Sequence, residues 1–239
     1  MNALDLREVA RMNAPDVDAP AHLRDAAVAT WHARMINEYA SSRVFVALAR
    51  QLESCGFDED ADEVVQFADE ERRHGVLCGA VVEALGGEAR GALFEAPKWP
   101  EHRGATARVA LVRNVVSVCC MSETVAVALI GAERLEMPDG SLRELLTRIW
   151  ADEIGHARFG WRFLERVART LTTEERAAVR AYVPIALAHL EAHEHAHLPA
   201  RAAPPGGEYL GLCSGLDTHV LLRETIDEVI APRIQSACA

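Results

Sequence analysis

Two stretches of the sequence place a glutamate and a histidine three residues apart: Glu71 with His74, and Glu153 with His156. If these stretches are helical, both side chains of each pair project from the same face of one turn. A carboxylate and an imidazole in that position can chelate one metal ion. One such pair arises often by chance, so the prediction of a metal site depends on the repetition and on what precedes each copy.

Each pair is preceded by a single glutamate at a similar distance. Glu38 lies 33 residues before Glu71, and Glu123 lies 30 residues before Glu153. Each half of the sequence would thus form a helical hairpin that supplies one Glu and then one Glu-x-x-His. Around a pseudo-two-fold axis, four such helices direct four carboxylates and two imidazoles to one place, which is the ligand set of dinuclear carboxylate centres in helix bundles. The predicted metal ligands are Glu38, Glu71, His74, Glu123, Glu153 and His156.

The surroundings of Glu123 support this prediction. Residues 115–130 are almost entirely apolar, so no face of a helix there would be well solvated. Burying an ionised carboxylate without a partner costs several kcal/mol or more. A buried salt bridge to Arg72 or Arg73 is the alternative, but it would leave Glu38 and the two histidines unexplained. Bound cations account for all of them.

The donor set limits the choice of metal. Two divalent cations would balance four carboxylates, and six oxygen and nitrogen ligands suit iron or manganese better than structural zinc, which prefers four ligands. Glu70 and Asp152 each precede a ligand glutamate, and metal-bound histidines usually donate their second ring N–H to a carboxylate. We therefore expect Asp152 to contact His74 and Glu70 to contact His156. The alternative is that both are ordinary surface acids.

The elements that must position these residues are helices. Alanine, leucine, arginine and glutamate are abundant and aromatic residues are few, a composition typical of helical chains. Glycines and prolines divide the sequence into segments of helical length, because both residues end or interrupt helices. The expected helices cover residues 20–55, 60–85, 105–136 and 141–171, with Ser141 as an N-cap, then a fifth that begins at Thr172 or Thr173 and is kinked at Pro184, and a last one near 217–230.

The lengths of the connections predict the topology. Short turns join the first helix to the second and the third to the fourth, and short turns make antiparallel neighbours. The long connection 88–104, with Pro97 and Pro100 as helix breakers, can cross the full length of a bundle. We therefore predict an all-α fold in one domain, residues 1–239, with a four-helix bundle of two antiparallel hairpins over 20–171 and additional C-terminal helices over 172–239.

Composition excludes several classes of protein. A net charge of −11 argues against a general nucleic-acid or anionic-membrane surface. The first 20 residues lack the basic-then-apolar order of a signal peptide. Residues 115–132 approach the length of a membrane span, but Glu123 in their middle favours a buried helix of a bundle. The six cysteines contain no C-x-x-C pair and are expected to be reduced thiols of a cytoplasmic protein.

A second group of metal-binding side chains lies near the end of the predicted fifth helix: His189, His193, His195 and His197. His189 and His193 are one helical turn apart, a spacing that suits a metal site. Glu191 and Glu194 lie between these histidines, however, and that pattern is more typical of a solvated helix face. From the sequence we interpret this run as solvated surface.

Over residues 21–169 the doubled motif resembles that of the di-iron carboxylate oxygenases and oxidases of the ferritin-like superfamily. Rubrerythrins carry an additional ligand glutamate where this sequence has Ala126 and Val127, and ferritins lack the second complete Glu-x-x-His. Arylamine N-oxygenases have a third histidine where Ile149 stands. The symmetric six-ligand set is most similar to that of aldehyde-deformylating oxygenases, ribonucleotide reductase small subunits and bacterial monooxygenase hydroxylases.

The resemblance implies a cofactor of two iron ions, with a mixed manganese–iron or a di-manganese centre as alternatives. It also implies an oxidoreductase that activates O2 to oxygenate or oxidise a small organic substrate, with electrons from an external donor. Two other functions stay open: a ferroxidase or rubrerythrin-like peroxide scavenger, and a non-catalytic helical interaction protein stabilised by metal. No nucleic-acid or membrane partner is expected, and the sequence leaves the oligomeric state open.

Overall fold

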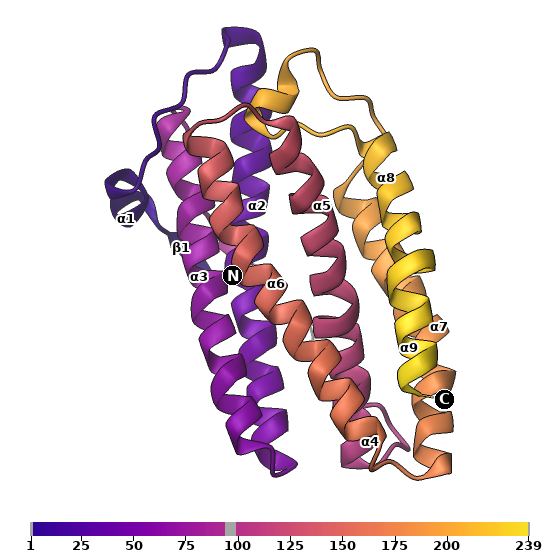
Figure 1. The fold of residues 1–239 in the computed structure, drawn as a ribbon. Coiled ribbons are helices and arrows are strands. Elements are labelled where there is room, and N and C mark those ends of the chain that lie inside the picture. Colours follow the sequence, from indigo (N-terminus) through magenta and orange to yellow (C-terminus); the bar gives the residue numbers. More distant parts are fainter. Residues whose placement is uncertain (1, 94–98, 239) are drawn as a thin grey trace. The chain divides into compact units, whose positions relative to one another are not determined.

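The structure, a computed structural model, describes residues 2–93 and 99–238, and most of these residues are helical (Figure 1). The predicted all-α class is therefore confirmed. Pro97, one of the two expected helix breakers, lies outside the described residues. The chain divides into two compact units, named unit 1 and unit 2 below. Unit 1 comprises Met1–Trp99, Glu133–Ile149 and Ala203–Cys213, and unit 2 comprises Pro100–Ala132, Trp150–Ala202 and Ser214–Ala239.

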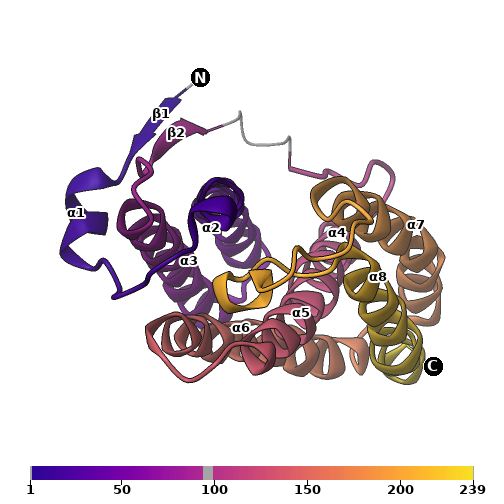
Figure 2. The same ribbon diagram turned by 90° about the horizontal axis from the view of Figure 1, so that it is seen from above.

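The long helices of unit 1 are α2 (Ala21–Ser54) and α3 (Asp58–Ala84), which agree with the predicted first hairpin to within two residues at each end. The turn between them contains Gly56 with φ of 77°, a left-handed conformation that glycine adopts without steric penalty. Three acidic residues occupy the first turn of α3, where they interact favourably with the helix dipole. The two helices run side by side and antiparallel (Figure 1, Figure 2).

A two-stranded antiparallel sheet, absent from the predicted fold, ties the start of unit 1 to the segment that follows α3. In this sheet β1 (Asn2–Asp5) pairs with β2 (Arg90–Leu93), so that Ala3 lies opposite Ala92. Figure 2 shows the pair beside the short helix α1 (Arg7–Met12). Residues 2–5 therefore belong to the folded unit.

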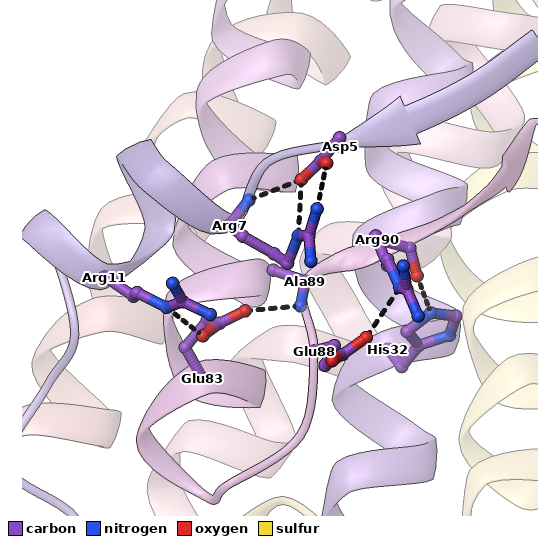
Figure 3. Close-up of polar contacts among 8 residues, drawn as sticks. All are labelled: Asp5, Arg7, Arg11, His32, Glu83, Glu88, Ala89 and Arg90. Carbon is purple, nitrogen blue, oxygen red and sulfur yellow. Dashed lines mark hydrogen bonds and ion pairs between the residues drawn. The ribbon is translucent and has the colours of Figure 1, made fainter.

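Polar contacts hold this N-terminal segment in place (Figure 3). The Asp5 carboxylate accepts hydrogen bonds from the side chain and the backbone N–H of Arg7, and these bonds lower the pKa of Asp5 to about 2. Glu83 on α3 accepts a hydrogen bond from Arg11 Nε at 2.7 Å and another from the Ala89 N–H at 2.7 Å. Burial alone would raise the pKa of Glu83, but these two donors outweigh burial and lower it.

The remaining parts of unit 1 come from later in the chain. They are the last residues of α5 (Glu123–Glu136), the first residues of α6 (Ser141–Ala168) and the 3-10 turn η2 (Gly207–Leu210). The prediction that Ser141 caps α6 is wrong, because Ser141 is the first residue of the helix itself. Its hydroxyl instead donates a hydrogen bond to the Asp16 carbonyl at 2.5 Å.

The predicted third helix is continuous, but it is not α-helical throughout. After α4 (Ala107–Val115) the chain forms a π-helix, η1 (Val116–Ser122), and α5 continues from Glu123. Thr106 caps the start of α4 through its hydroxyl. The span 107–136 is long and apolar enough to cross a membrane by length and composition, yet half of its most apolar window is buried inside the structure. Core helices of soluble proteins pass the same test, and the structure is compatible with a soluble protein.

Unit 2 also contains the helices of the C-terminal part of the chain. These are α7 (Thr173–His197), α8 (Gly215–Glu224), the π-helix η3 (Thr225–Ile230) and α9 (Ala231–Ala237). The last three follow one another without a break, so the final helical segment is longer at both ends than predicted. Within unit 2, η1 packs against both α7 and η3.

The predicted start of α7 is confirmed. Thr172 accepts a hydrogen bond from the Glu175 N–H, and the Glu175 side chain accepts one from the Thr172 N–H, which makes a reciprocal capping box. The helix continues on both sides of Pro184. The division into a core over residues 20–171 and accessory helices over 172–239 stays a prediction.

Candidate metal centre

Unit 1 brings together three of the six predicted ligands, named half-site 1: Glu38, Glu71 and His74. Each offers one ligand atom, and these atoms lie within 4.8 Å of one another. Nδ1 of His74 is 3.6 Å from Oε2 of Glu38 and 4.0 Å from Oε1 of Glu71. Glu71 and His74 are buried, with exposed fractions of 2% and 1%, whereas the Glu38 side chain remains 13% exposed.

Close packing of α2 against α3 explains how these side chains meet. A Cβ atom added at Gly75 would lie 3.0 Å from the Cβ of Tyr39, so glycine lets the two helices approach closely at this point. Gly75 follows His74 in the chain, and Tyr39 follows Glu38. The contact that brings the helices together therefore also sets Glu38 opposite His74.

Unit 2 brings together the other three predicted ligands, named half-site 2: Glu123, Glu153 and His156. Their ligand atoms also lie within 4.8 Å of one another. Nδ1 of His156 is 3.4 Å from Oε2 of Glu123 and 3.2 Å from Oε2 of Glu153. The exposed fractions of the three residues are 9%, 2% and 0%. Each half-site is a buried Glu/His group that could hold a metal ion.

The backbone immediately before Glu123 has an unusual geometry. The π-helix η1 ends at Ser122, so Glu123 is the first residue of α5. The Ser122 hydroxyl donates a hydrogen bond to the carbonyl of Ser117, five residues earlier, at 3.1 Å. Short π-helical segments inside longer helices occur frequently at functional sites. The apolar sequence of this segment did not predict the π-helix.

The π-helix η1 also lies very close to α6. A Cβ atom added at Gly160 would lie 2.5 Å from the Cβ of Cys119, a distance that real Cβ atoms do not reach. Gly160 is one turn after His156, and Cys119 is one turn before Glu123. This contact thus positions the two ligand-bearing helices of half-site 2, as the contact at Gly75 does in half-site 1.

The carboxylates of half-site 2 are unfavourable in their ionised form unless a cation is present. Burial raises the pKa of Glu123 well above its ordinary value, and nearby Glu153 raises it further. The hydrogen bond and the charge of His156 act in the opposite direction, but more weakly. A divalent cation would favour the ionised form of both carboxylates and would remove this penalty.

A buried ion pair lies one helical turn from Glu38, and the sequence analysis missed it. Arg34 donates two hydrogen bonds to Glu133, at 2.9 and 2.7 Å, and Glu133 is 5% exposed. Burial alone would lower the pKa of Arg34, but Glu133 raises it well above its ordinary value. Cys78 is close to the same groups, and burial and the charge of Glu38 raise the pKa of its thiol. The sequence gives no distinctive signal for this pair, because Glu133 lies next to Arg134 and close to another glutamate in the charged last turn of α5.

The arginines considered as alternative partners of Glu123 have partners on their own helix. Arg72 pairs with Asp69, and Arg73 lies 3.3 Å from Glu70, all on α3. The side chains of Arg72 and Arg73 remain 41% and 60% exposed. Both arginines therefore have exposed positions and ion pairs within unit 1.

The remaining site predictions concern residues of different units. They are the expected contacts of Asp152 with His74 and of Glu70 with His156, together with the union of the two half-sites in one centre. These stay predictions.

Comparison with known proteins gives no match. No protein-family model, curated protein or solved structure matches this chain. The functional interpretation therefore depends on the residues of the two half-sites.

Proposed function

We propose that half-site 1 and half-site 2 together hold two iron ions, and that the protein is an oxidoreductase that uses them to activate O2 and to oxygenate or oxidise a small organic substrate. One observation carries the proposal: each unit by itself gathers a glutamate and a Glu-x-x-His motif into a buried cluster. The proposed scaffold is a ferritin-like four-helix bundle in which α2, α3, α5 and α6 surround one dinuclear centre.

The charge and number of the donors support a dinuclear centre. Four carboxylates balance the charge of two divalent cations, and two imidazoles complete a set of three protein ligands for each ion. Three ligands leave further coordination positions for solvent, O2 or substrate. Oxygen and nitrogen donors suit both iron and manganese, and the resemblance of the doubled motif to di-iron oxygenases favours iron.

When bound, the two iron ions supply electrons for the reduction of O2, and an external donor must restore them. The residues of the chain position the ions and keep the site dry. His74 and His156 each follow a ligand glutamate by three residues, so the helix fixes the direction from which each imidazole binds. In the π-helix η1, which leads into Glu123, the side chains of Val116 and Cys119 are fully buried. Such an apolar wall excludes water and strengthens the electrostatic interactions inside the site.

Anaerobic titration with Fe(II) tests the metal centre. We expect two ions per chain, and we expect Glu38→Ala and Glu123→Ala each to abolish this stoichiometry while the circular dichroism spectrum stays helical. Glu136→Ala is the matched control, because Glu136 is an exposed glutamate on the same helix as Glu123. Normal iron content in the Glu123→Ala protein would contradict the ligand assignment.

Oxygen uptake by the iron-loaded protein tests the reaction. In the presence of a chemical reductant, O2 consumption should require both half-sites and should be lost in the Glu38→Ala and Glu123→Ala proteins. Rapid oxidation of many equivalents of Fe(II) to a mineral would identify a ferroxidase instead. Faster turnover of hydrogen peroxide than of O2 would identify a peroxide scavenger. Either result would overturn the proposed reaction, but the proposed metal centre would still stand.

A further inference from the structure

The end of α7 carries two adjacent histidines that the proposed dinuclear centre does not use. His193 and His197 lie one turn apart on the same face of the helix, and both are exposed. Their ring centroids are 4.2 Å apart, with 37° between the ring planes. Both residues belong to unit 2 and lie more than 30 positions beyond the last residue of half-site 2.

A hydrogen bond determines which nitrogen of His197 can bind a metal. Its Nδ1 is 2.8 Å from the carbonyl oxygen of His193. A carbonyl oxygen only accepts hydrogen bonds, so Nδ1 carries the hydrogen, and in the neutral ring the lone pair lies on Nε2. A hydrogen bond from one ring nitrogen to a backbone carbonyl is a usual way of orienting a metal-binding imidazole. His197 therefore has the orientation and the tautomer of a ligand.

We propose that His193 and His197 chelate one divalent transition-metal ion, such as Zn²⁺ or Ni²⁺, at the surface of unit 2, with water in the remaining coordination positions. Two histidines four residues apart on one helix face are a recurrent zinc-binding pair, and imidazole nitrogen is a favoured ligand of zinc, nickel and copper. The rings are exposed, as the sequence predicted, and exposure leaves them accessible to a metal ion. The site is independent of the proposed dinuclear centre.

The charges around the pair favour a cation. His197 is the last residue of α7, and the C-terminal end of the helix dipole stabilises positive charge. Glu191 and Glu194 lie in the same segment, and the whole chain carries a net charge of −11. Glu194 follows His193 as the catalytic glutamate does in the H-E-x-x-H motif of zinc peptidases. Because both rings are exposed at the surface, we propose only that the pair binds a metal ion, and not that it hydrolyses peptides.

His195 provides an internal control, because it belongs to the same run and has a different neighbour. It is two residues from each member of the pair, so its side chain projects from the opposite side of the helix. Its ring centroid lies 4.4 Å from that of His219 on α8. His219 in turn donates a hydrogen bond from Nε2 to the Leu198 carbonyl at 2.6 Å. Replacing His195 removes a neighbouring histidine and leaves the proposed chelate intact.

Calorimetric titration of the full chain with Zn²⁺, after purification without a polyhistidine tag, tests the site. His193→Asn and His197→Asn should each weaken the surface site at least about tenfold, since even residues that only orient a metal ligand contribute about 10–100-fold in affinity. His195→Asn should bind Zn²⁺ like the unmodified protein. Circular dichroism should give the same helical spectrum for all three proteins, because the replaced side chains are exposed.

The Glu123→Ala protein separates this site from half-site 2. It should retain the zinc site that depends on His193 and His197, and loss of that site would assign the zinc signal to half-site 2 and overturn the proposal. The proposal would also fail if His193→Asn had no effect, or if all three histidine variants weakened binding equally.

Discussion

Half-site 1 and half-site 2 contain the same three types of side chain, but their supports differ. In half-site 1, Glu38 stands on a regular α-helix, and the buried Arg34–Glu133 ion pair lies one turn away. In half-site 2, Glu123 follows a π-helix, and burial and Glu153 raise its pKa. The same ligand pattern is thus supported by a neutralised charge pair in one unit and by an altered backbone in the other.

Among the variants that test this comparison, breaking the Arg34–Glu133 ion pair should have the largest effect on the free energy of unfolding. Arg34→Met should lower the free energy of unfolding by about 3–5 kcal/mol, because it leaves the buried Glu133 carboxylate without its cation. The double variant Arg34→Met/Glu133→Gln should recover most of this loss, because neither side chain of the former pair then carries a charge. Urea unfolding measures both changes. A loss of less than about 1 kcal/mol in the single variant, typical of exposed pairs, would show that the ion pair is not a support of half-site 1.

Adding a methyl group at the two helix contacts should have the next largest effect. Gly160→Ala should cost about 1–3 kcal/mol of unfolding free energy through overpacking, because its Cβ would lie 2.5 Å from Cys119. Gly75→Ala should cost less, because the nearest atom of Tyr39 is at 3.0 Å. Gly155→Ala is the control: its Cβ meets nothing within 4 Å, and helix propensity predicts a gain of up to about 1 kcal/mol. If Gly75→Ala and Gly160→Ala lowered the free energy of unfolding equally, the helix contact in half-site 2 would not be the tighter of the two.

The smallest expected change in the free energy of unfolding is the one that a shift of one pH unit causes in the metal-free protein. The pKa of Glu123 is raised in the folded state from an ordinary value of 4.5, so the folded chain keeps a proton that the unfolded chain releases. Stability should therefore fall as the pH rises above 4.5 towards the raised pKa, by at most about 1.4 kcal/mol per pH unit for one proton.

Replacing this carboxyl sharpens the test. Glu123→Gln should flatten the decline of the urea midpoint with rising pH, and Glu38→Gln should retain it because Glu123 is unchanged. A decline that is equally steep in the Glu123→Gln protein would assign it to other groups.

The features that depend on neighbouring residues could be predicted from the sequence. The spacing of glycines and prolines gave the bounds of α2 and α3, and the threonine at position 172 gave the start of α7. The same local periodicity placed each glutamate of a Glu-x-x-His motif on the same face as its histidine. The gathering of Glu38 with His74, and of Glu123 with His156, then follows from antiparallel pairing across short turns.

The features that depend on distant partners could not be predicted. Residues 2–5 form a strand by pairing with Arg90–Leu93, and their sequence, Asn-Ala-Leu-Asp, contains no β-branched or aromatic residue that would favour a strand. Arg34 and Glu133 are 99 positions apart, so no local pattern links them. The ideal α-helical spacing assumed for residues 116–122 fails where the chain packs onto Gly160, and only the folded structure reveals that contact.

The division of the chain into two units has a practical consequence for its dissection. The boundaries at residues 132/133 and 149/150 fall inside α5 and α6, and each unit is assembled from three separate stretches of sequence. No single truncated polypeptide can therefore contain one whole unit and nothing else. A protease that cuts between α5 and α6, at residues 137–140, would separate stretches of both units, and exchanging one whole unit for another would require joints within helices.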